Sequence, residues 1–312
     1  MKHLIFKIST LSLVLISVLF SCGNSGDKIT LEYNLKQGEI LKQNVVMNMD
    51  LVQKLGEQEM KISLVSEMKM AFEIRESQKD GYAMEIKVKG IKMTAGVPGM
   101  GNLSFDSNTD KDVATQADLG PMFKAIIDKP IESVMTKTGK LQSVKGLDKF
   151  MEAMINSFGE DTSEDVRQQI TGQLGSQFSE EAFKSQLEQG LGFFPDRPVG
   201  TGDSWDYKMT TNASNFTMNI DMKSTLKSIE GNVVSIDVNG TVSTPGGESE
   251  QEISGIKAKI SLNGTQKGTL KVNRDTGWVI SSDLAMNFNG NMEVMGMKIP
   301  VYAASTIKVT GE

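Results

Sequence analysis

The sequence has almost no side chains suited to nucleophilic or metal chemistry. Its 312 residues include one histidine, His3, and one cysteine, Cys22, both close to the N-terminus. From Gly23 onward the chain has neither an imidazole nor a thiol. The remaining chain therefore cannot build a Ser-His-Asp triad, a cysteine nucleophile, a histidine metal site or a disulfide.

A basic surplus is also missing. The chain has 33 Lys and Arg against 39 Asp and Glu, a formal net charge of −6. Nucleic-acid binding needs a basic surface, so we expect no nucleic-acid partner. Attraction to anionic lipid headgroups is equally disfavoured, so acyl chains would have to supply any membrane attachment.

The N-terminus has the parts of a lipoprotein signal peptide. A basic start precedes an apolar run, 8–20, which is too short to span a bilayer because that takes ~20 residues. Leu19-Phe20-Ser21-Cys22 then resembles the recognition pattern of the lipoprotein signal peptidase. We predict a signal peptide at 1–21, lipidation of Cys22 and a flexible tether at 22–27. A secreted protein with an incidental Cys22 is the alternative.

Lipidation would determine where the protein resides. Two or three acyl chains anchor a protein essentially permanently, whereas one holds it only marginally. No acidic run follows Cys22 directly, whereas the surface-export signals of Bacteroidetes lipoproteins resemble such a run. We therefore predict an outer-membrane, lipid-anchored protein that faces the periplasm, with the membrane as partner through its N-terminal acyl chains.

Two regions, 28–117 and 192–312, alternate apolar and polar residues with the period of half-buried strands. Turns fall between the runs, so neighbouring strands should pair antiparallel. The Asn-Gly pairs at Gly240, Gly264 and Gly290 are expected to supply positive φ at turns or kinks, and Gly296 to mark a bulge. This expectation is based on the conformations that such dipeptides favour.

The intervening region, 118–191, changes to helical period. We expect a short helix near Pro121, a hairpin turning at Thr138-Gly139, and three amphipathic helices at 147–158, from Thr162 and from Ser179. The predicted fold class is therefore α+β. It comprises a curved, long-stranded, mostly antiparallel sheet with an inserted helical segment.

The two β regions resemble each other. Lys36-Gln37-Gly38-Glu39 matches Gly200-Thr201-Gly202-Asp203, and Asp80-Gly81 and Glu230-Gly231 follow at comparable distances. This similarity favours two related β units with the helical segment between them. Chance similarity between two β meanders is the alternative.

Three further motifs resemble a known family. They are Tyr33-x-Leu35-x-x-Gly38-Glu39, Ser104-Phe105-Asp106-Ser107 and Phe194-Pro-Asp-Arg-Pro-Val-Gly-Thr-Gly-Asp-Ser-Trp205. Together with the N-terminal pattern, they resemble a family of uncharacterised Bacteroidetes lipoproteins, which is filed as a domain of unknown function. The resemblance implies an envelope protein and brings no activity.

Oxygen-rich stretches suggest two candidate sites. Asp106 to Asp112 places oxygen ligands at every second position, as a calcium loop does, but Lys111 stands where such a loop needs glycine. Asp203 and Asp206 flank Ser204-Trp205 and could be the paired acids of a hydrolase. Residues three apart in a strand face opposite ways, which favours a turn capped by Asp203.

Methionine is abundant on the predicted inward faces of the strands. Pairs such as Met47 and Met49 could bind Cu(I), but strand geometry already places both on one face, so core packing explains them. We predict no catalytic residue, no metal and no cofactor. The methionines on these faces are Met47, Met49, Met68, Met70, Met84, Met218, Met222 and Met286.

Flexible methionines beneath long strands favour a non-catalytic binding module for a lipophilic or protein ligand. A structural or interaction lipoprotein of the outer membrane with a dry core is the alternative, and a hydrolase is the third possibility.

Overall fold

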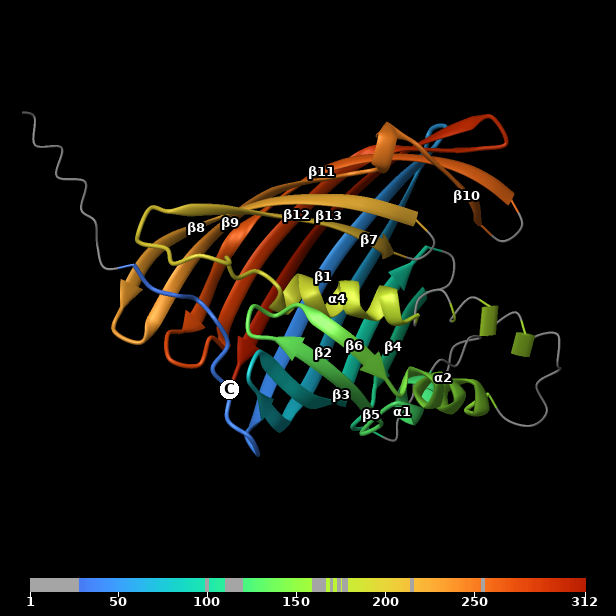
Figure 1. Cartoon of the computed structure of the whole chain (residues 1–312). Coiled ribbons are helices and arrows are strands. Elements are labelled where there is room, and N and C mark those ends of the chain that lie inside the picture. Colours follow the sequence, from blue (N-terminus) through green and yellow to red (C-terminus); the bar gives the residue numbers. More distant parts are fainter. Residues whose placement is uncertain are drawn as a thin grey trace, which may run out of the picture.

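The fold is one large antiparallel sheet. The structure, a computed structural model, describes residues 28–98, 101–109, 120–158, 167–168, 171–172, 175, 179–213, 216–253 and 256–312. The sheet has thirteen strands, in the order β6-β5-β3-β2-β1-β13-β12-β11-β9-β8-β7, with β4 beside β3 and β10 beside β11 (Figure 1). The C-terminal strand β13 therefore pairs with the first strand β1 and joins the two halves of the chain.

The strands are long. They are β1 (Ile40–Leu55), β2 (Gln58–Gln78), β3 (Gly81–Val97), β4 (Gly101–Asp106), β5 (Pro130–Thr136), β6 (Leu141–Lys145), β7 (Ser204–Ala213), β8 (Phe216–Glu230), β9 (Val233–Ser243), β10 (Ser249–Ile253), β11 (Ile256–Asn273), β12 (Val279–Val294) and β13 (Met297–Gly311). The expectation of long antiparallel strands is thus confirmed.

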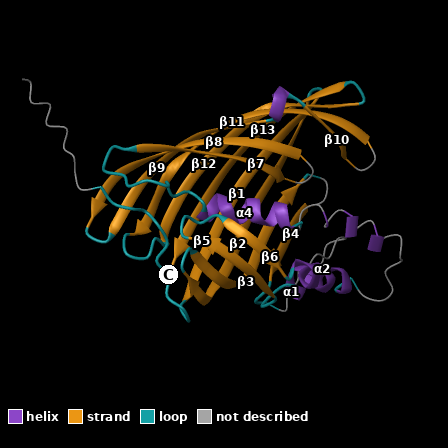
Figure 2. Cartoon of the chain, viewed as in Figure 1, coloured by secondary structure: helices purple, strands orange, loops and turns teal. Residues whose placement is uncertain are grey.

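The predicted α+β class is wrong, because the protein is mostly β. The helices whose bounds fall within the described residues are α1 (Gly120–Ala125), α2 (Leu147–Asn156) and α4 (Glu180–Leu191), with one 3-10 turn, η1 (Pro245–Gly247). The region expected to be a helical insertion also contributes β5 and β6 to the sheet. The helices cover a continuous sheet and form no layer comparable to it (Figure 2).

Several local predictions within that region are confirmed. A helix begins near Pro121, a hairpin turns at Thr138-Gly139, and α2 occupies most of the helix predicted at 147–158. The hydroxyl oxygen of Ser179 accepts the N–H of Ala182 at 3.2 Å and caps α4. The predicted start of the next helix, at Thr162, lies outside the described residues, while 167–168, 171–172 and 175, which the structure describes, are helical as predicted.

Helix α4 lies against both outer strands of the main sheet path, β6 and β7. Glu188 Oε1 accepts the N–H of Leu141 on β6 at 2.6 Å, and Glu180 Oε1 accepts that of Val144 at 3.2 Å. On the other side, the Ser185 hydroxyl donates to the carbonyl of Thr210 on β7 at 3.4 Å. Side chains of α4 therefore bond backbone groups that a neighbouring strand would otherwise occupy.

The turns before β1 and β7 share one hydrogen-bond pattern. Gly38 N–H donates to the Ile74 carbonyl at 2.8 Å, and Ile74 N–H donates to that of Glu39 at 2.9 Å. The backbone φ of Gly38 is +83°, a conformation that glycine tolerates without strain. The Glu39 carboxylate also accepts the N–H of Lys36 at 3.1 Å.

The second turn repeats each of these contacts. Gly202, with φ +91°, donates to the Leu226 carbonyl at 2.8 Å. Leu226 N–H donates back to Asp203 at 3.0 Å, and the Asp203 carboxylate accepts the N–H of Gly200 at 3.0 Å. This agreement supports two related β units, which are joined here within a single sheet.

The sheet is curved, and α4 lies on its concave side (Figure 1). An N-terminal arm, residues 28–39, closes one end of that side. Tyr33 is fully buried there, with ring centroids 5.1 Å from Phe194 and 6.3 Å from Trp278. Its hydroxyl donates to the carbonyl of Leu191 at the end of α4, at 3.1 Å. The arm therefore links the sheet to the helix, and its Leu31, Tyr33 and Leu35 are part of the hydrophobic core.

The Asn-Gly pairs lie inside strands, so the prediction that they form turns or kinks is wrong. Each glycine lies against a large side chain of the next strand. An added Cβ would come within 2.6 Å of Phe288 at Gly264, and within 2.9 Å of Met222 at Gly240. The predicted bulge at Gly296 is instead the β12–β13 turn, where Met295 and Gly296 have φ of +51° and +79°.

Candidate functional site

The two faces of the sheet differ sharply in polarity. On the convex face, charged side chains form ion pairs across neighbouring strands, such as Lys61–Asp50 at 3.5 Å and Lys308–Asp283 at 3.6 Å. The strand positions that alternate with them point to the concave side. Among the described residues of β1, β2, β11, β12 and β13, none of these concave positions holds Asp, Glu, Lys or Arg.

Beyond the core, the concave face carries apolar side chains that remain partly exposed. We name these residues the concave apolar patch. It is continuous with the buried core through the same strands, and its most exposed member is Met68, at 37%. The patch consists of Met47, Met49, Leu51, Ile62, Leu64, Met68, Met286 and Phe288.

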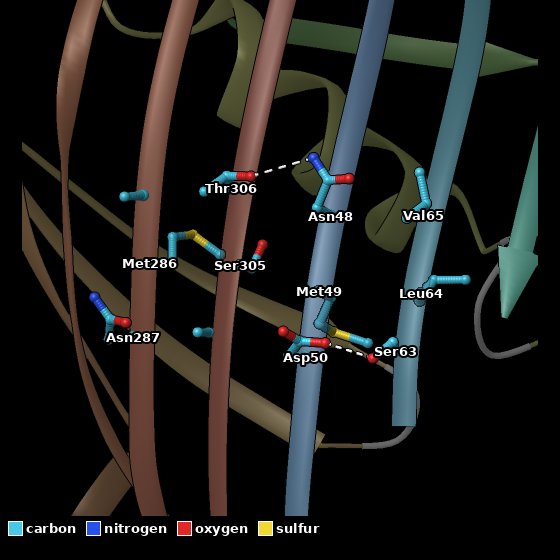
Figure 3. Close-up of a pocket in the computed structure, with 12 residues that line it drawn as sticks. Asn48, Met49, Asp50, Ser63, Leu64, Val65, Met286, Asn287, Ser305 and Thr306 are labelled. Atoms are coloured by element: carbon cyan, nitrogen blue, oxygen red, sulfur yellow. Dashed lines mark hydrogen bonds between the residues drawn. The ribbon is translucent and has the colours of Figure 1, made fainter. Parts of the chain in front are cut away.

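The strand register places part of the patch in one row. Met49 lies opposite Leu64 on β2 and opposite Ser305 on β13. Ser305 lies opposite Met286, which lies opposite Gln266 on β11. Directly opposite residues share a face, so five strands contribute neighbouring side chains to this row. Figure 3 shows Met286 reaching toward Ser305.

Two members of the row are buried and polar. Ser305 is 7% exposed and Gln266 is 8% exposed. The Ser305 hydroxyl oxygen has no hydrogen-bond partner within the described part of the chain. Buried polar groups are normally paired, so an unpaired hydroxyl on an apolar face is a feature that requires an explanation.

A shallow depression on the convex face has a different character. Its rim includes Asp50 and Ser63, whose hydroxyl donates to the carboxylate at 2.5 Å, and Asn48, whose amide donates to Thr306 at 3.4 Å (Figure 3). The Ser63 hydrogen bond, assisted by the charge of Lys61, lowers the pKa of Asp50. These groups satisfy one another in contact with solvent.

Asp203, the first of the two candidate acids, caps a turn, as the favoured interpretation expected. The Gly200 N–H is the main cause that lowers the pKa of Asp203, aided by the charges of Lys28 and Arg197. Trp205 is 8% exposed and its indole N–H donates to the carbonyl of Phe193 at 2.8 Å. The interpretation as a capped turn followed by a core tryptophan is confirmed.

Two other predicted features lie wholly or partly outside the described residues. Cys22 and its tether are among them, as are Asp110 and Asp112 of the acidic loop. Within the described part of that loop, the carboxylate of Asp106 accepts the N–H of Asn108 at 2.9 Å.

Of the eight inward methionines, Met84, Met218 and Met222 are buried, while Met47, Met49, Met68 and Met286 belong to the patch. The eighth, Met70, packs against the core. Sequence reasoning overlooked Ser305 and Gln266. The alternation of inward and outward positions along each strand could have indicated them, because each is a polar residue at an inward position where the other inward residues of its strand are apolar.

Comparison with known proteins identifies the family. The family of unknown function DUF6263 matches residues 79–279. The chain belongs to this family. The part that matches DUF6263 runs from the β2–β3 turn to the start of β12 and includes Gln266, while Ser305 and all eight residues of the patch lie outside it. The family has no known function, so membership assigns no activity.

Solved structures offer only weak likeness. An outer membrane channel from Pseudomonas putida F1 has a TM-score of 0.26 at 6% identity, covering 90% of this chain and 97% of the channel. OmpF of Salmonella typhi, in complex with daunomycin, scores 0.20 at 7% identity, covering 90% and 100%. The translocator domain of the autotransporter NalP from Neisseria meningitidis scores 0.20 at 7%, covering 90% of each chain.

TM-scores this low carry no argument about fold or function. No curated protein matches the sequence significantly. Among the described residues, no helix combines the length and apolar character needed to cross a bilayer.

Proposed function

We propose that this protein is a non-catalytic envelope protein that holds a lipophilic ligand on the concave face of its sheet. The observation that carries the proposal is the concave apolar patch, which is uncharged, methionine-rich and partly exposed. Exposed apolar surface of this kind marks a place where another molecule binds. Methionine suits ligands of variable shape because its side chain is flexible and polarizable.

The proposal includes lipidation of Cys22 and attachment to the outer membrane, facing the periplasm. The support is the N-terminal sequence pattern. Intact-mass measurement of the native protein tests it. We expect a chain that begins at Cys22 and carries acyl mass, and an unmodified or differently cleaved N-terminus would contradict lipidation.

A binding assay tests the main proposal. Full chain, stripped of lipid, is titrated with the fluorescent probe N-phenyl-1-naphthylamine, and we expect saturable binding. Lipid that co-purifies with the native protein should also be detected by mass spectrometry. Absence of both signals would contradict the proposal and favour a dry core or a protein partner.

Adjacent residues of β2 provide a matched pair of variants. Leu64 belongs to the patch, while Val65 points to the convex face and is 46% exposed. Leu64→Gln should weaken probe binding about tenfold, because a polar amide replaces an apolar contact worth roughly 1.4 kcal/mol. Val65→Gln should leave binding unchanged. Equal effects of the two variants would exclude the concave face as the binding surface.

A further inference from the structure

We propose that the ligand is an uncharged lipid whose polar group, a hydroxyl, ester or amide, is held by Ser305 and Gln266. This inference depends on the proposed function and specifies its ligand. It concerns the row of side chains that crosses the patch from Leu64 to Gln266.

Ser305 and Gln266 flank Met286 on the concave face. Ser305 is directly opposite Met286 on one side, and Gln266 is directly opposite it on the other. Neighbouring strands lie ~4.8 Å apart, so the backbones of β13 and β11 are separated by roughly 10 Å. The long side chain of Gln266 can bring its amide considerably closer to the Ser305 hydroxyl than the backbones are. The pair can therefore contact one small polar group from two sides.

Neither side chain has a partner of its own. The Ser305 hydroxyl is buried and unpaired, and the side-chain amide of Gln266 makes no hydrogen bond to another described residue. Leaving a buried hydroxyl such as that of Ser305 unpaired destabilises the folded protein, whereas a bound polar group would satisfy it. Serine and glutamine each offer a donor and an acceptor, which suits a hydroxyl, an ester or an amide.

The surrounding face determines the charge of the ligand. The described concave positions of the five strands that form the row contain no charged side chain. A carboxylate or phosphate held there would lose its hydration without gaining a counter-charge, which is strongly unfavourable. An uncharged polar group carries a much smaller penalty, and Ser305 and Gln266 can offset it.

The rest of the row suits an acyl chain. Met49 and Leu64 continue from Ser305 across β1 and β2, and both are apolar and partly exposed. A hydrocarbon chain lying over them would remove apolar surface from water on both partners. The row therefore offers an apolar track that ends at a polar pair.

Three probes with one pyrene-labelled chain test this inference on the lipid-free full-length protein. They end in a primary alcohol, an ionised carboxylate or a methyl group. We expect the alcohol to bind about five- to tenfold more tightly than the other two, since one buried hydrogen bond contributes that much. Ser305→Ala and Gln266→Leu should each reduce the affinity for the alcohol and leave that for the methyl-terminated probe unchanged.

Ser133→Ala is the matched control. Ser133 is 3% exposed and its hydroxyl is also unpaired, but it lies on β5, away from the row. This variant should leave the affinities for all three probes unchanged. Circular dichroism and urea unfolding would verify that each variant is folded.

The outcomes separate the two proposals. Tightest binding of the carboxylate, or equal binding of all three probes with no effect of Ser305→Ala, would overturn the polar pair while leaving lipid binding intact. Binding of none of the probes would overturn the proposed function itself.

Discussion

Gly268 lies directly beneath the side chain of Leu284 on the neighbouring strand. A Cβ at position 268 would come within 2.8 Å of Leu284 Cδ2 and within 2.0 Å of the Asp283 carbonyl oxygen. Gly264 and Phe288 repeat this relationship two rows along the same two strands, on the other side of Gln266 and Met286. Glycine on β11 therefore makes space for large side chains of β12 on the concave face.

This relationship predicts the effect of added volume. Gly268→Ala should lower the free energy of unfolding by about 1–3 kcal/mol, because overpacking forces side chains and backbone to shift. Urea unfolding followed by circular dichroism measures the change. Gly96→Ala is the control, since its nearest neighbour is a side-chain atom of Asn102 at 3.4 Å, and it should have little effect. Equal losses in both variants would contradict the explanation.

The β12–β13 turn predicts a stabilising substitution. Met295 has φ +51°, is 85% exposed and precedes Gly296, whose φ is +79°. Asparagine adopts this conformation more readily than methionine, and Asn-Gly is the preferred pair for such hairpin turns. Met295→Asn should raise the midpoint of urea unfolding, because the free energy of unfolding should increase by up to about 1 kcal/mol. Met297 lies outside the turn, so Met297→Asn should leave the midpoint unchanged or lower it. A lower midpoint for Met295→Asn would refute the expectation.

The turn before β7 predicts a pH-dependent effect. The Gly200 N–H and two nearby cations hold the pKa of Asp203 below its ordinary value of 3.8. The stability that the ionised carboxylate contributes is therefore present above that value and is lost as the pH falls through the lower, folded-state pKa. Asp203→Ala should destabilise the protein near pH 7, and the difference from wild type should shrink at about pH 2. A difference that does not change with pH would argue against this role.

Helix α4 predicts a change in the titration of a tyrosine. Burial, together with the nearby charge of Glu188, raises the pKa of Tyr207 to about 12. Glu188→Gln should lower the pKa of Tyr207 without bringing it to the ordinary value, because burial is the larger cause. Ultraviolet absorption of tyrosinate measures this, and Tyr207→Phe identifies the signal. An unchanged titration would exclude Glu188 as a cause.

The same glutamate supports the edge of β6. Glutamine retains the side-chain oxygen that accepts the Leu141 N–H, so Glu188→Gln should change stability little. Glu188→Ala removes the acceptor and should cost roughly 1 kcal/mol, or more if the N–H stays unpaired. Urea unfolding of the two variants provides the comparison, and similar losses would show that the hydrogen bond contributes nothing.

Local features were predictable from the sequence to the extent that short-range chemistry determines them. The alternation in β1 and β2, the Ser179 cap of α4 and the turn at Asp203 depend on residues close together in the chain. The pairing of β1 with β13 joins strands more than two hundred residues apart, and no local signal indicates it. The α+β prediction failed because amphipathic helices indicate a surface to cover without revealing how large that surface is.

The Asn-Gly pairs illustrate a competing cause. Their dipeptide preference favours a turn, but the neighbouring strand requires a residue without a side chain at Gly264, and tertiary packing prevailed. The candidate site was only partly predictable for a related reason. Alternation places Met49 and Ser305 on inward faces, but only the register shows that they are neighbours.

The contacts of α4 with β6 and β7 have a consequence for association between molecules. An outer strand with free backbone groups can recruit another strand, which leads to open-ended assemblies. Glu180, Glu188 and Ser185 already bond backbone groups of β6 and β7. These groups are therefore not available to pair with a strand of another copy of the protein.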